Sequence, residues 1–338
     1  LQGSSFAADG TISLNAGNDV LLGAVEDKTA HQFDLGSFSG SRERTTYRVV
    51  NIDAGEHLLI NAGRDIVGEG SQLSAGGSAM LNAERDIHLS AVANVDHSAF
   101  DRKDYERSGT IITHTQATVN ADGDASLHAG QDINLTGANI IADRNISLHA
   151  ERDTNILAVT DSEHHYLYER DDKSFGRSET TEVETLSSTN VGSVIQAGGN
   201  ITVNTLLDEG GDVHLQNSRN VTIQGSLLDA GSDIAVSALE NVTMTTGQET
   251  YLDYSHRSSS GLGGLTRRSQ SDTAADVVQV GSMLNSGNDV VVMAGNDVGI
   301  AGSVVSPNND VELYAGWIND EGDINIESVS HERFRASE

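Results

Sequence analysis

The sequence contains no cysteine and only one proline among its 338 residues. Without cysteine there are no disulfide bonds and no cysteine-ligated metals. The scarcity of proline fits a chain built mainly of sheets, because proline cannot donate to a sheet's hydrogen-bond ladder. The absence of cysteine also suits a bacterial extracellular protein that crosses a cell envelope without oxidative folding.

Aromatic residues make up only 4% of the chain, and basic residues are also few, with 20 Lys and Arg against 50 Asp and Glu. The resulting net charge of −30 argues against a nucleic-acid partner, because phosphate binding needs a positively charged groove. No apolar run approaches the roughly 20 residues that span a bilayer. Leu1 begins within repeat-like sequence rather than in a secretory leader, and Glu327 to Glu338 lack a clear cap, so we expect a fragment of a longer repeat protein whose signal peptide lies elsewhere.

Acidic residues recur at a step of 21 positions. The pairs are Asp65 and Asp86, Asp132 and Asp153, Asp212 and Asp233, and Asp289 and Asp310. The local unit resembles Ala62-Gly63-Arg64-Asp65-Ile66, in which Gly and Asp suit tight corners and alternating apolar residues suit short strands. We therefore predict an all-β fold, a parallel β-solenoid with about 21 residues per rung, about ten rungs and a length of roughly 50 Å. Residues 1–338 form a single domain in this interpretation.

Equal phase in a solenoid predicts vertical ladders of equivalent residues. The expected inward ladder comprises Ile66, Ile87, Ile133, Val221, Val242 and Val298. The Asx residues before them are expected to bond neighbouring backbone groups. Thr154 interrupts the apolar ladder, which we interpret as a local imperfection. His128 and His149 are expected to stack without binding zinc, which needs three or four converging ligands.

Four segments interrupt the repeat, approximately at residues 26–51, 96–120, 160–190 and 248–280. Their aromatics and alternating runs predict protruding β-hairpins, and the last would turn at Gly261 to Gly264. The starts are about 70, 64 and 88 residues apart, so three or four rungs are expected between hairpins, which could leave the solenoid on a common side.

The four insertions hold 10 of the 14 aromatic residues and 13 of the 20 Lys and Arg residues. They are therefore the candidate surface for a partner or membrane. The candidate contact residues are Phe33, Arg42, Arg44, Tyr47, Phe100, Tyr105, Arg107, Tyr166, Tyr168, Arg177, Tyr251, Tyr254, Arg257, Arg267 and Arg268. The alternative is that the aromatics pack across strand pairs and onto the solenoid flank, as hairpins need such support.

The carboxylates do not form a pattern typical of an enzyme. A lyase site needs clustered carboxylates with a nearby Arg or Lys, whereas these Asp residues recur evenly at corners. We therefore predict no catalytic residue, no cofactor and no small-molecule substrate. Adventitious calcium binding along the acidic ladders stays open.

Two segments carry a more specific pattern, and each follows an aromatic, Ser-rich insertion. They are Val191-Gly192-Ser193-Val194-Ile195-Gln196-Ala197-Gly198-Gly199-Asn200-Ile201 and Val280-Gly281-Ser282-Met283-Leu284-Asn285-Ser286-Gly287-Asn288-Asp289-Val290. With the Ala-Gly-x-Asp units, this pattern resembles the filamentous-haemagglutinin repeats of two-partner-secretion exoproteins. The resemblance covers essentially the whole chain and implies a right-handed β-helix.

The hairpin-bearing version is most similar to the second haemagglutinin-repeat region of contact-dependent growth inhibition effectors. The resemblance implies secretion or display at the surface of a Gram-negative bacterium through an outer-membrane transporter. It also implies engagement of the target-cell outer membrane, or its proteins, during toxin delivery. A host-cell adhesin stalk of the filamentous-haemagglutinin type and a passive spacer remain alternatives, because both would be built from the same repeat pattern.

Overall fold

A computed structural model describes residues 1–207, 213–215, 218–261, 264–317 and 321–338. Nearly all of this part of the chain lies in β-strands and short turns. No helix within these ranges is long and apolar enough to cross a membrane. The predicted tip residues Leu262 and Gly263 lie outside the described residues, as does Asp212.

Three parallel sheets of nine strands form the solenoid, and each rung contributes one strand to each sheet. The first sheet contains β1 (Ser5–Ala8), β6 (Asn51–Ala54), β9 (Gln72–Ala75), β14 (Ala117–Ala121), β17 (Ala138–Ala142), β22 (Val194–Ala197), β27 (Leu227–Ala230), β32 (Met283–Ser286) and β35 (Val304–Pro307). The second contains β2 (Ile12–Ala16), β7 (Leu58–Ala62), β10 (Ala79–Ala83), β15 (Ala125–Ala129), β18 (Ile146–Ala150), β23 (Ile201–Val203), β28 (Ile234–Ala238), β33 (Val290–Ala294) and β36 (Val311–Tyr314). The third contains β3 (Val20–Leu22), β8 (Ile66–Glu69), β11 (Ile87–Ser90), β16 (Ile133–Thr136), β19 (Asp153–Leu157), β26 (Asn220–Gln224), β29 (Asn241–Thr245), β34 (Val298–Ala301) and β37 (Ile324–Glu327).

These sheets confirm the expected all-β parallel β-helix. Where no insertion intervenes, paired residues on adjacent rungs differ by 21 in number, as for Ile66 with Ile87 and Asn220 with Asn241. Each sheet holds nine strands, so the expectation of about ten rungs is one too many.

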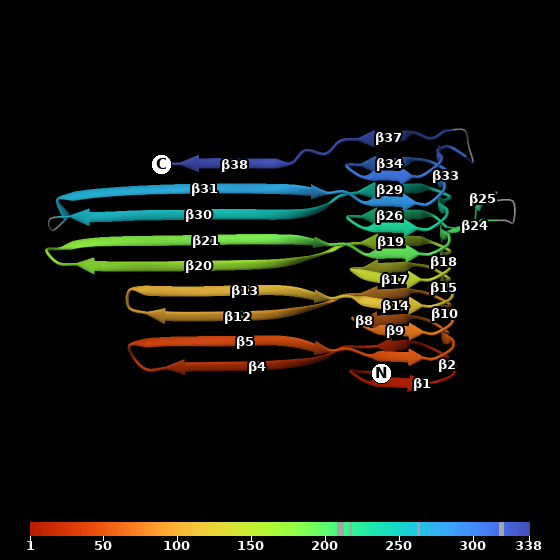
Figure 1. Cartoon of the computed structure of the whole chain (residues 1–338), viewed down its shortest axis with the longest axis horizontal. Helices are drawn as coiled ribbons and strands as arrows, with labels where there is room; N and C mark the ends of the chain where they lie inside the picture. The colour runs from red at the N-terminus through yellow and green to blue at the C-terminus, as the bar shows by residue number, and fades with distance from the viewer. Residues whose placement is uncertain (208–212, 216–217, 262–263, 318–320) are drawn as a thin grey trace.

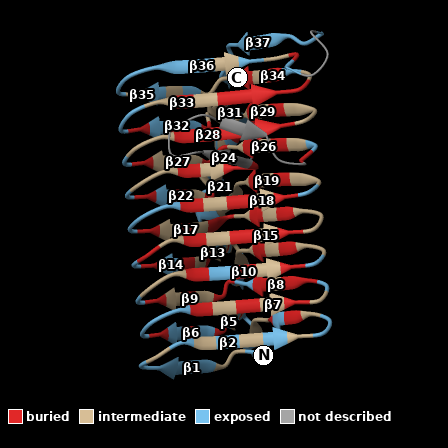
Figure 2. Ribbon diagram, turned by 90° about the vertical axis from the view of Figure 1, so that its right-hand side faces the viewer, coloured by how far each residue is buried: buried red, intermediate tan, exposed pale blue. Residues whose placement is uncertain are grey.

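The predicted ladder of apolar side chains lies in the solenoid interior. Every member from Ile66 to Val298 is buried, and Figure 2 shows buried positions recurring at the same place in successive rungs. Thr154 occupies the expected place between Ile133 and Val221, and its fully buried hydroxyl donates to the Asn204 side-chain oxygen over 3.3 Å. The interruption of the ladder is therefore a hydrogen-bonded polar pair, and not merely a packing fault.

The Asx side chains bond the rung that follows, as expected. The Asp153 backbone N–H donates to Asp132 Oδ1 over 3.2 Å, and the Asp310 N–H donates to Asp289 Oδ1 over 2.9 Å. The predicted step from Asp212 to Asp233 is wrong, because the Asp233 N–H donates to Asn200 Oδ1 over 3.0 Å. The equivalent of Asp233 on the preceding rung is thus Asn200, 33 positions earlier.

A short antiparallel pair explains this longer step. β24 (Thr205–Leu207) and β25 (Val213–Leu215) leave the rung directly after Asn204 and return before Ser218. Figure 1 places this pair on the side of the solenoid opposite the long hairpins. The sequence pattern did not predict it.

A fourth sheet of nine strands is antiparallel and projects from one side of the solenoid (Figure 1). In spatial order it contains β38 (Glu332–Ser337), β31 (Thr266–Val280), β30 (Gly247–Gly261), β21 (Arg177–Val191), β20 (Val159–Lys173), β13 (Tyr105–Thr115), β12 (Val92–Arg102), β5 (Phe38–Arg48) and β4 (Val25–Asp34). We call it the hairpin sheet. The predicted insertions overlap its four hairpins, but residues 117–120 and 51 belong to the solenoid strands β14 and β6.

All four hairpins replace the same corner, the one between the third and first solenoid sheets. At the intervening rungs this corner is only one or two residues long and contains a glycine with positive φ, at Gly70, Gly137, Gly225 and Gly302. Hairpin and glycine therefore alternate, so the hairpins recur every two rungs and not every three or four as predicted.

This alternation explains why the hairpins merge into one sheet. Two rungs rise by roughly 10 Å along the solenoid axis, and the two strands of a hairpin occupy the same width at about 4.8 Å each. Each hairpin edge consequently falls beside the next hairpin, as in the pairing of β13 with β20 and of β21 with β30. The rise of the solenoid therefore sets the spacing of the hairpins, and the edge strand of each hairpin pairs with the edge strand of the next.

The Val-Gly-Ser motif anchors the two longer hairpins where they return to the solenoid. A Cβ on Gly192 would lie 2.3 Å from the Gly225 carbonyl oxygen, so only glycine fits. The next residue, Ser193, is fully buried and donates its hydroxyl to the Leu157 carbonyl oxygen over 2.8 Å. Ser282 makes the same contact with the Thr245 carbonyl oxygen over 2.8 Å.

The last described strand, β38, pairs with β31 in the hairpin sheet. Its residues lie within Glu327–Glu338, the stretch that was predicted to lack a clear cap. It follows β37 at the corner where the alternation places a hairpin, so it occupies the position of an outgoing hairpin strand.

Candidate interaction surface on the hairpin sheet

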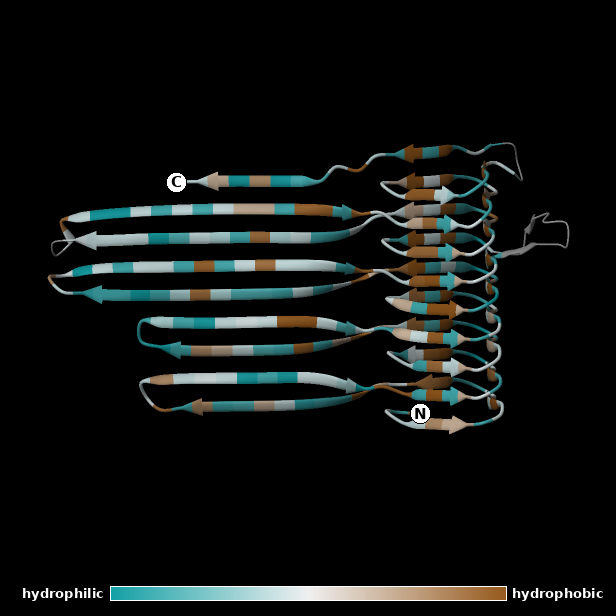
Figure 3. Cartoon of the chain, viewed as in Figure 1, coloured by the Kyte–Doolittle hydropathy of each residue, from teal (hydrophilic) through white to brown (hydrophobic). Residues whose placement is uncertain are grey.

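The hairpin sheet is a single layer, and its residues are mostly exposed or half-buried on both faces. Figure 3 shows it as largely hydrophilic, whereas apolar residues concentrate in the solenoid. Side chains paired across antiparallel strands lie on one face, so the continuous register defines the two faces of the sheet. One row crosses all nine strands: His31, Arg42, Ser98, Gly109, His165, Thr185, Asp253, Ala274 and Arg335.

The face that contains this row carries most of the cations, and we call it the arginine face. Eleven of the chain's 20 Lys and Arg side chains lie on it: Arg42, Arg44, Arg48, Arg102, Arg107, Lys173, Arg177, Arg257, Arg268, Arg333 and Arg335. The opposite face carries three cations, Lys28, Arg170 and Arg267, and the tyrosines Tyr47, Tyr166, Tyr168 and Tyr254; we call it the tyrosine face. Lys and Arg are thus segregated by face.

Carboxylates do not show the same segregation. The arginine face carries eleven Asp and Glu residues in these strands, which balances its charge, and the tyrosine face carries nine, which leaves it six charges negative. Several arginine-face acids are already paired, including Asp96 with Arg42, Glu179 with Lys173 and Asp276 with Arg333. The Arg42 guanidinium lowers the pKa of Asp96 through its hydrogen bond.

Several guanidinium groups on the arginine face have no such partner. Among the described residues, Arg44, Arg107, Arg177, Arg257 and Arg268 form no ion pair within 4.0 Å. Guanidinium groups without carboxylate partners are available to bind an external anion.

Four aromatic rings cluster near the tips of the first two hairpins, on the arginine face. Phe33 lies 6.0 Å from Phe38 and 6.5 Å from Phe100, and Phe100 lies 5.9 Å from Tyr105, measured between ring centroids. Gly40 lies under this cluster, and a Cβ there would come within 2.5 Å of the Phe33 ring. The rings support one another across strands, as the packing alternative predicted, yet Phe33 and Phe38 remain 45% and 37% exposed.

The tyrosine face is organised by hydrogen bonds to carboxylates. The Tyr166 hydroxyl donates to Glu182 over 3.2 Å, and the His164 ring nitrogen lies 2.9 Å from Glu184. Partial burial, with Glu182 nearby, raises the pKa of Tyr166 to about 12. The Tyr166 hydroxyl is therefore held by the sheet.

The fifteen predicted contact residues do not form one surface. Ten lie on the arginine face: Phe33, Arg42, Arg44, Phe100, Tyr105, Arg107, Arg177, Tyr251, Arg257 and Arg268. Five lie on the tyrosine face: Tyr47, Tyr166, Tyr168, Tyr254 and Arg267. The predicted set omitted Phe38, Arg48, Arg102, Lys173, Arg333 and Arg335, although strict alternation from Arg42 and Phe100 points to the first three.

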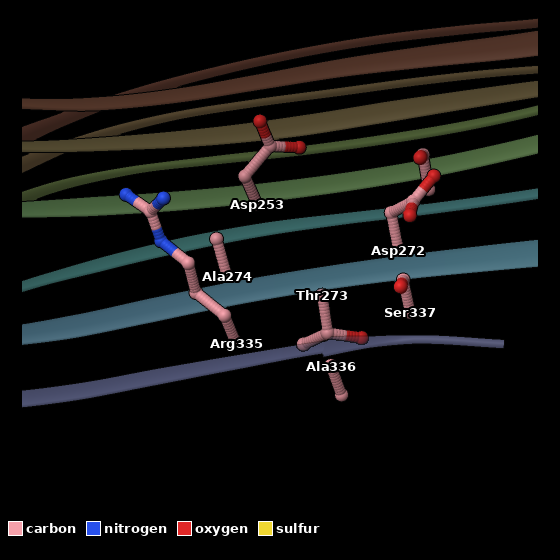
Figure 4. Close-up of a pocket in the computed structure, with 8 residues that line it drawn as sticks. Asp253, Asp272, Thr273, Ala274, Arg335, Ala336 and Ser337 are labelled. Carbon is pink, nitrogen blue, oxygen red and sulfur yellow. The ribbon is translucent and has the colours of Figure 1, made fainter.

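A shallow pocket on the arginine face lies beside β38 (Figure 4). Asp253, Asp272 and Arg335 line it, with small side chains between them. The described residues contain no group of three or more His, Asp or Glu side chains arranged to hold a metal ion. The solenoid's His128 and His149 rings stack as expected, 4.9 Å apart.

A family profile described as "Hemagglutinin repeat" matches residues 36–111, 99–170, 173–267 and 262–338. Relatives include the tRNA nuclease CdiA of Escherichia coli (strain STEC_O31), which is 28% identical over 92% of this chain and 10% of its own length. They also include a hemolysin of Proteus mirabilis, 23% identical over 98% of this chain and 22% of its own length. The tRNA nuclease CdiA-2 of Burkholderia pseudomallei is 22% identical over 94% of this chain and 10% of its own length. No solved structure matches the chain significantly.

The chain thus spans between a tenth and about a fifth of these three relatives. The repeat profile covers nearly all of it, and each matched segment contains or overlaps a hairpin. Such proteins are secreted or carried on the cell surface of Gram-negative bacteria, as the sequence predicted. The chain belongs to the hemagglutinin-repeat family and is a filamentous repeat region similar to those of CdiA proteins.

Proposed function

We infer that this repeat region engages the outer membrane of a target cell and so assists toxin delivery by a longer secreted effector. The observation that carries the proposal is the segregation of cations onto one exposed face of the hairpin sheet. A sheet that only braced the solenoid would have no need to collect eleven of 20 cations on one side.

The role is mechanical and interfacial, and no reaction is assigned to these residues. The solenoid supplies a stiff, regularly spaced support, and the hairpin sheet supplies the contact surface. The relatives named as nucleases are much longer than this chain, so those names support only membership of a toxin-delivering protein. Export of the parent chain would use an outer-membrane transporter of the two-partner type.

Electrostatics give the proposal a definite signature. Most of the chain's charge of −30 lies off the arginine face, so an anionic bacterial surface repels the molecule as a whole. Contact through the arginine face would then weaken with salt, because screening shortens the reach of its unpaired guanidinium groups. Divalent ions that bridge acidic groups would strengthen binding in any orientation.

The test is binding of the purified chain to intact Gram-negative cells and outer-membrane vesicles. We expect Arg44→Gln, Arg107→Gln and Arg257→Gln together to reduce binding strongly. The control replaces two ion-paired cations of the tyrosine face, Lys28 and Arg170, with Gln and should bind as wild type does. Equal binding by both variants would contradict a role for the arginine face, and binding to no bacterial strain would leave the chain a spacer.

A further inference from the structure

The tips of the two longer hairpins carry the most exposed large apolar side chains of the described chain. Phe175, in the β20–β21 turn, is 89% exposed, and Leu265, in the turn directly before β31, is 85% exposed. The shorter β4–β5 turn has Leu35, which is 66% exposed. Isolated apolar residues on a surface are ordinary, so Leu35 needs no explanation, but the two most exposed large apolar side chains both lie at the tips of the longer hairpins.

The backbone at Phe175 is also unfavourable for this residue. Its φ is +65°, and Gly176 follows with φ +68°. A bulky side chain rarely adopts this left-handed region, where glycine or asparagine would turn the chain with less strain. Folding gains little from Phe175, since the ring is neither buried nor supported. A strained, exposed aromatic residue at a turn therefore points to a role outside folding.

Cations line a groove directly behind the two apolar tips. A groove at the distal end of β21, β30 and β31 is lined by Lys173, Arg177, Arg267 and Arg268, together with the hydroxyls of Ser178, Ser259, Ser260 and Thr266. Glu179 is the only carboxylate in its lining, and Lys173 neutralises it over 2.8 Å. The other three cations form no ion pair among the residues that the structure describes.

The lengths of the hairpins determine which tips reach a surface first. The strands β20, β21, β30 and β31 have 15 residues each, whereas β4, β5, β12 and β13 have 10 or 11. At about 3.3 Å per residue, four residues extend the longer pair by roughly 13 Å. Figure 1 shows these two hairpins reaching beyond the others. Phe175 and Leu265 thus form the leading edge of the hairpin sheet.

We propose that the tips of the third and fourth hairpins bind an anionic lipid bilayer, with Phe175 and Leu265 inserted among the acyl chains and Arg177, Arg267 and Arg268 paired with headgroup phosphates. Apolar side chains at a leading edge with cations directly behind them match the layering of a bilayer interface. Guanidinium groups pair with phosphate through parallel hydrogen bonds. This lipid contact rests on the proposed membrane engagement and names its ligand.

Co-sedimentation with vesicles tests the proposal on the full chain. We expect binding to vesicles of phosphatidylglycerol mixed with phosphatidylcholine, and much weaker binding to pure phosphatidylcholine. Phe175→Ser with Leu265→Ser should weaken binding at least tenfold, since each buried apolar side chain accounts for about a tenfold change in affinity. The matched control Leu35→Ser removes an exposed leucine from a shorter hairpin and should have no effect.

A fluorescent probe reports insertion independently of affinity. Phe175→Trp, in a chain whose one natural tryptophan is removed by Trp317→Phe, should shift its emission to the blue on adding anionic vesicles. No shift, or equal binding by the wild type and the Phe175/Leu265 variant, would overturn the proposal. Soluble glycerol phosphate should compete poorly, because it offers the headgroup without the acyl layer.

The cell-binding assay separates failure of this inference from failure of the proposed function. Binding to cells and outer-membrane vesicles without binding to lipid vesicles would leave membrane engagement intact and reject lipid as its ligand. Binding to neither membrane would reject both.

Discussion

The Asn204 side-chain amide donates to the Thr154 hydroxyl over 3.0 Å inside the solenoid, where every neighbouring rung places an apolar residue in the Thr154 ladder. The Asn204 oxygen also accepts the Ala150 backbone N–H over 2.8 Å. Asn204 has φ +54° and is the residue at which the chain leaves its rung toward β24. The pair therefore satisfies the polar groups that this departure buries.

Replacing Thr154 with valine should destabilise the chain, although valine restores the apolar ladder. The substitution leaves the buried Asn204 amide without its partner, which typically costs about 1–3 kcal/mol. Thr154→Ser is the matched control, because it keeps the hydroxyl. The free energy of unfolding from denaturant titration distinguishes the two, and a valine variant as stable as wild type would mean that the bond contributes nothing.

The corner glycines should tolerate substitution poorly. A Cβ on Gly70, where φ is +58°, would lie 2.8 Å from Val49 and 2.9 Å from Val92, at the roots of the first two hairpins. We expect Gly70→Ala to cost about 1–3 kcal/mol through backbone strain, with added crowding.

Gly17 supplies the control for this prediction, because a Cβ there meets nothing within 4 Å and its φ is not positive. Gly17→Ala should leave the unfolding midpoint near the wild-type value. Hydrogen exchange should report loosening in Gly70→Ala at the roots of β5 and β12. Equal midpoints for both variants would show that the corner accommodates a methyl group.

The stacked histidines should make stability depend on pH. Burial, and then His128, lowers the pKa of His149 from its ordinary value. Protonation therefore favours the unfolded chain, so stability is complete above the ordinary histidine pKa of about 6.5 and falls as the pH drops below it. His149→Asn introduces the residue found at Asn61 and Asn82 of the same ladder. Unfolding titrations between about pH 7.5 and 5.5 should show a smaller loss in this variant; an identical loss would exclude His149 as the cause.

Much of the solenoid was predictable from the sequence because its residues repeat in phase. The apolar ladder, the Asx corners and the stacked histidines each follow from position within a rung. The spacing of 21 between Asp212 and Asp233 misled the prediction. Residues inserted within a rung can produce the same spacing as one full rung. Spacing alone does not reveal that the residue beneath Asp233 in the Asx ladder is Asn200.

The hairpin sheet was harder to predict because its organisation depends on a match between the rise of two solenoid rungs and the width of one two-stranded hairpin. Aromatic and basic residues identified the insertions, but they did not indicate that the hairpins pair edge to edge. That pairing places Arg107 on the arginine face and Tyr166 on the tyrosine face. The tip residue Phe175 is not among the predicted contact residues, although it lies two positions before Arg177. A bulky residue beside Gly176 in a tight turn is the signal that could have identified it.

Removing one hairpin tests whether the sheet is one cooperative unit. The change replaces residues 91–116 with a single glycine, copying the natural corner Thr136-Gly137-Ala138. The solenoid should keep its rungs, because that corner already exists on the neighbouring turn, and its circular dichroism and thermal midpoint should change little.

The strands β5 and β20 would each lose a partner, since the gap between them is roughly 10 Å wider than a strand pair allows. Hydrogen exchange should therefore accelerate in β5 and β20 but not in the distant strand pair β30 and β31. Unchanged protection in β5 and β20 would mean that each hairpin is stable alone, and collapse of the whole chain would mean that the sheet supports the solenoid.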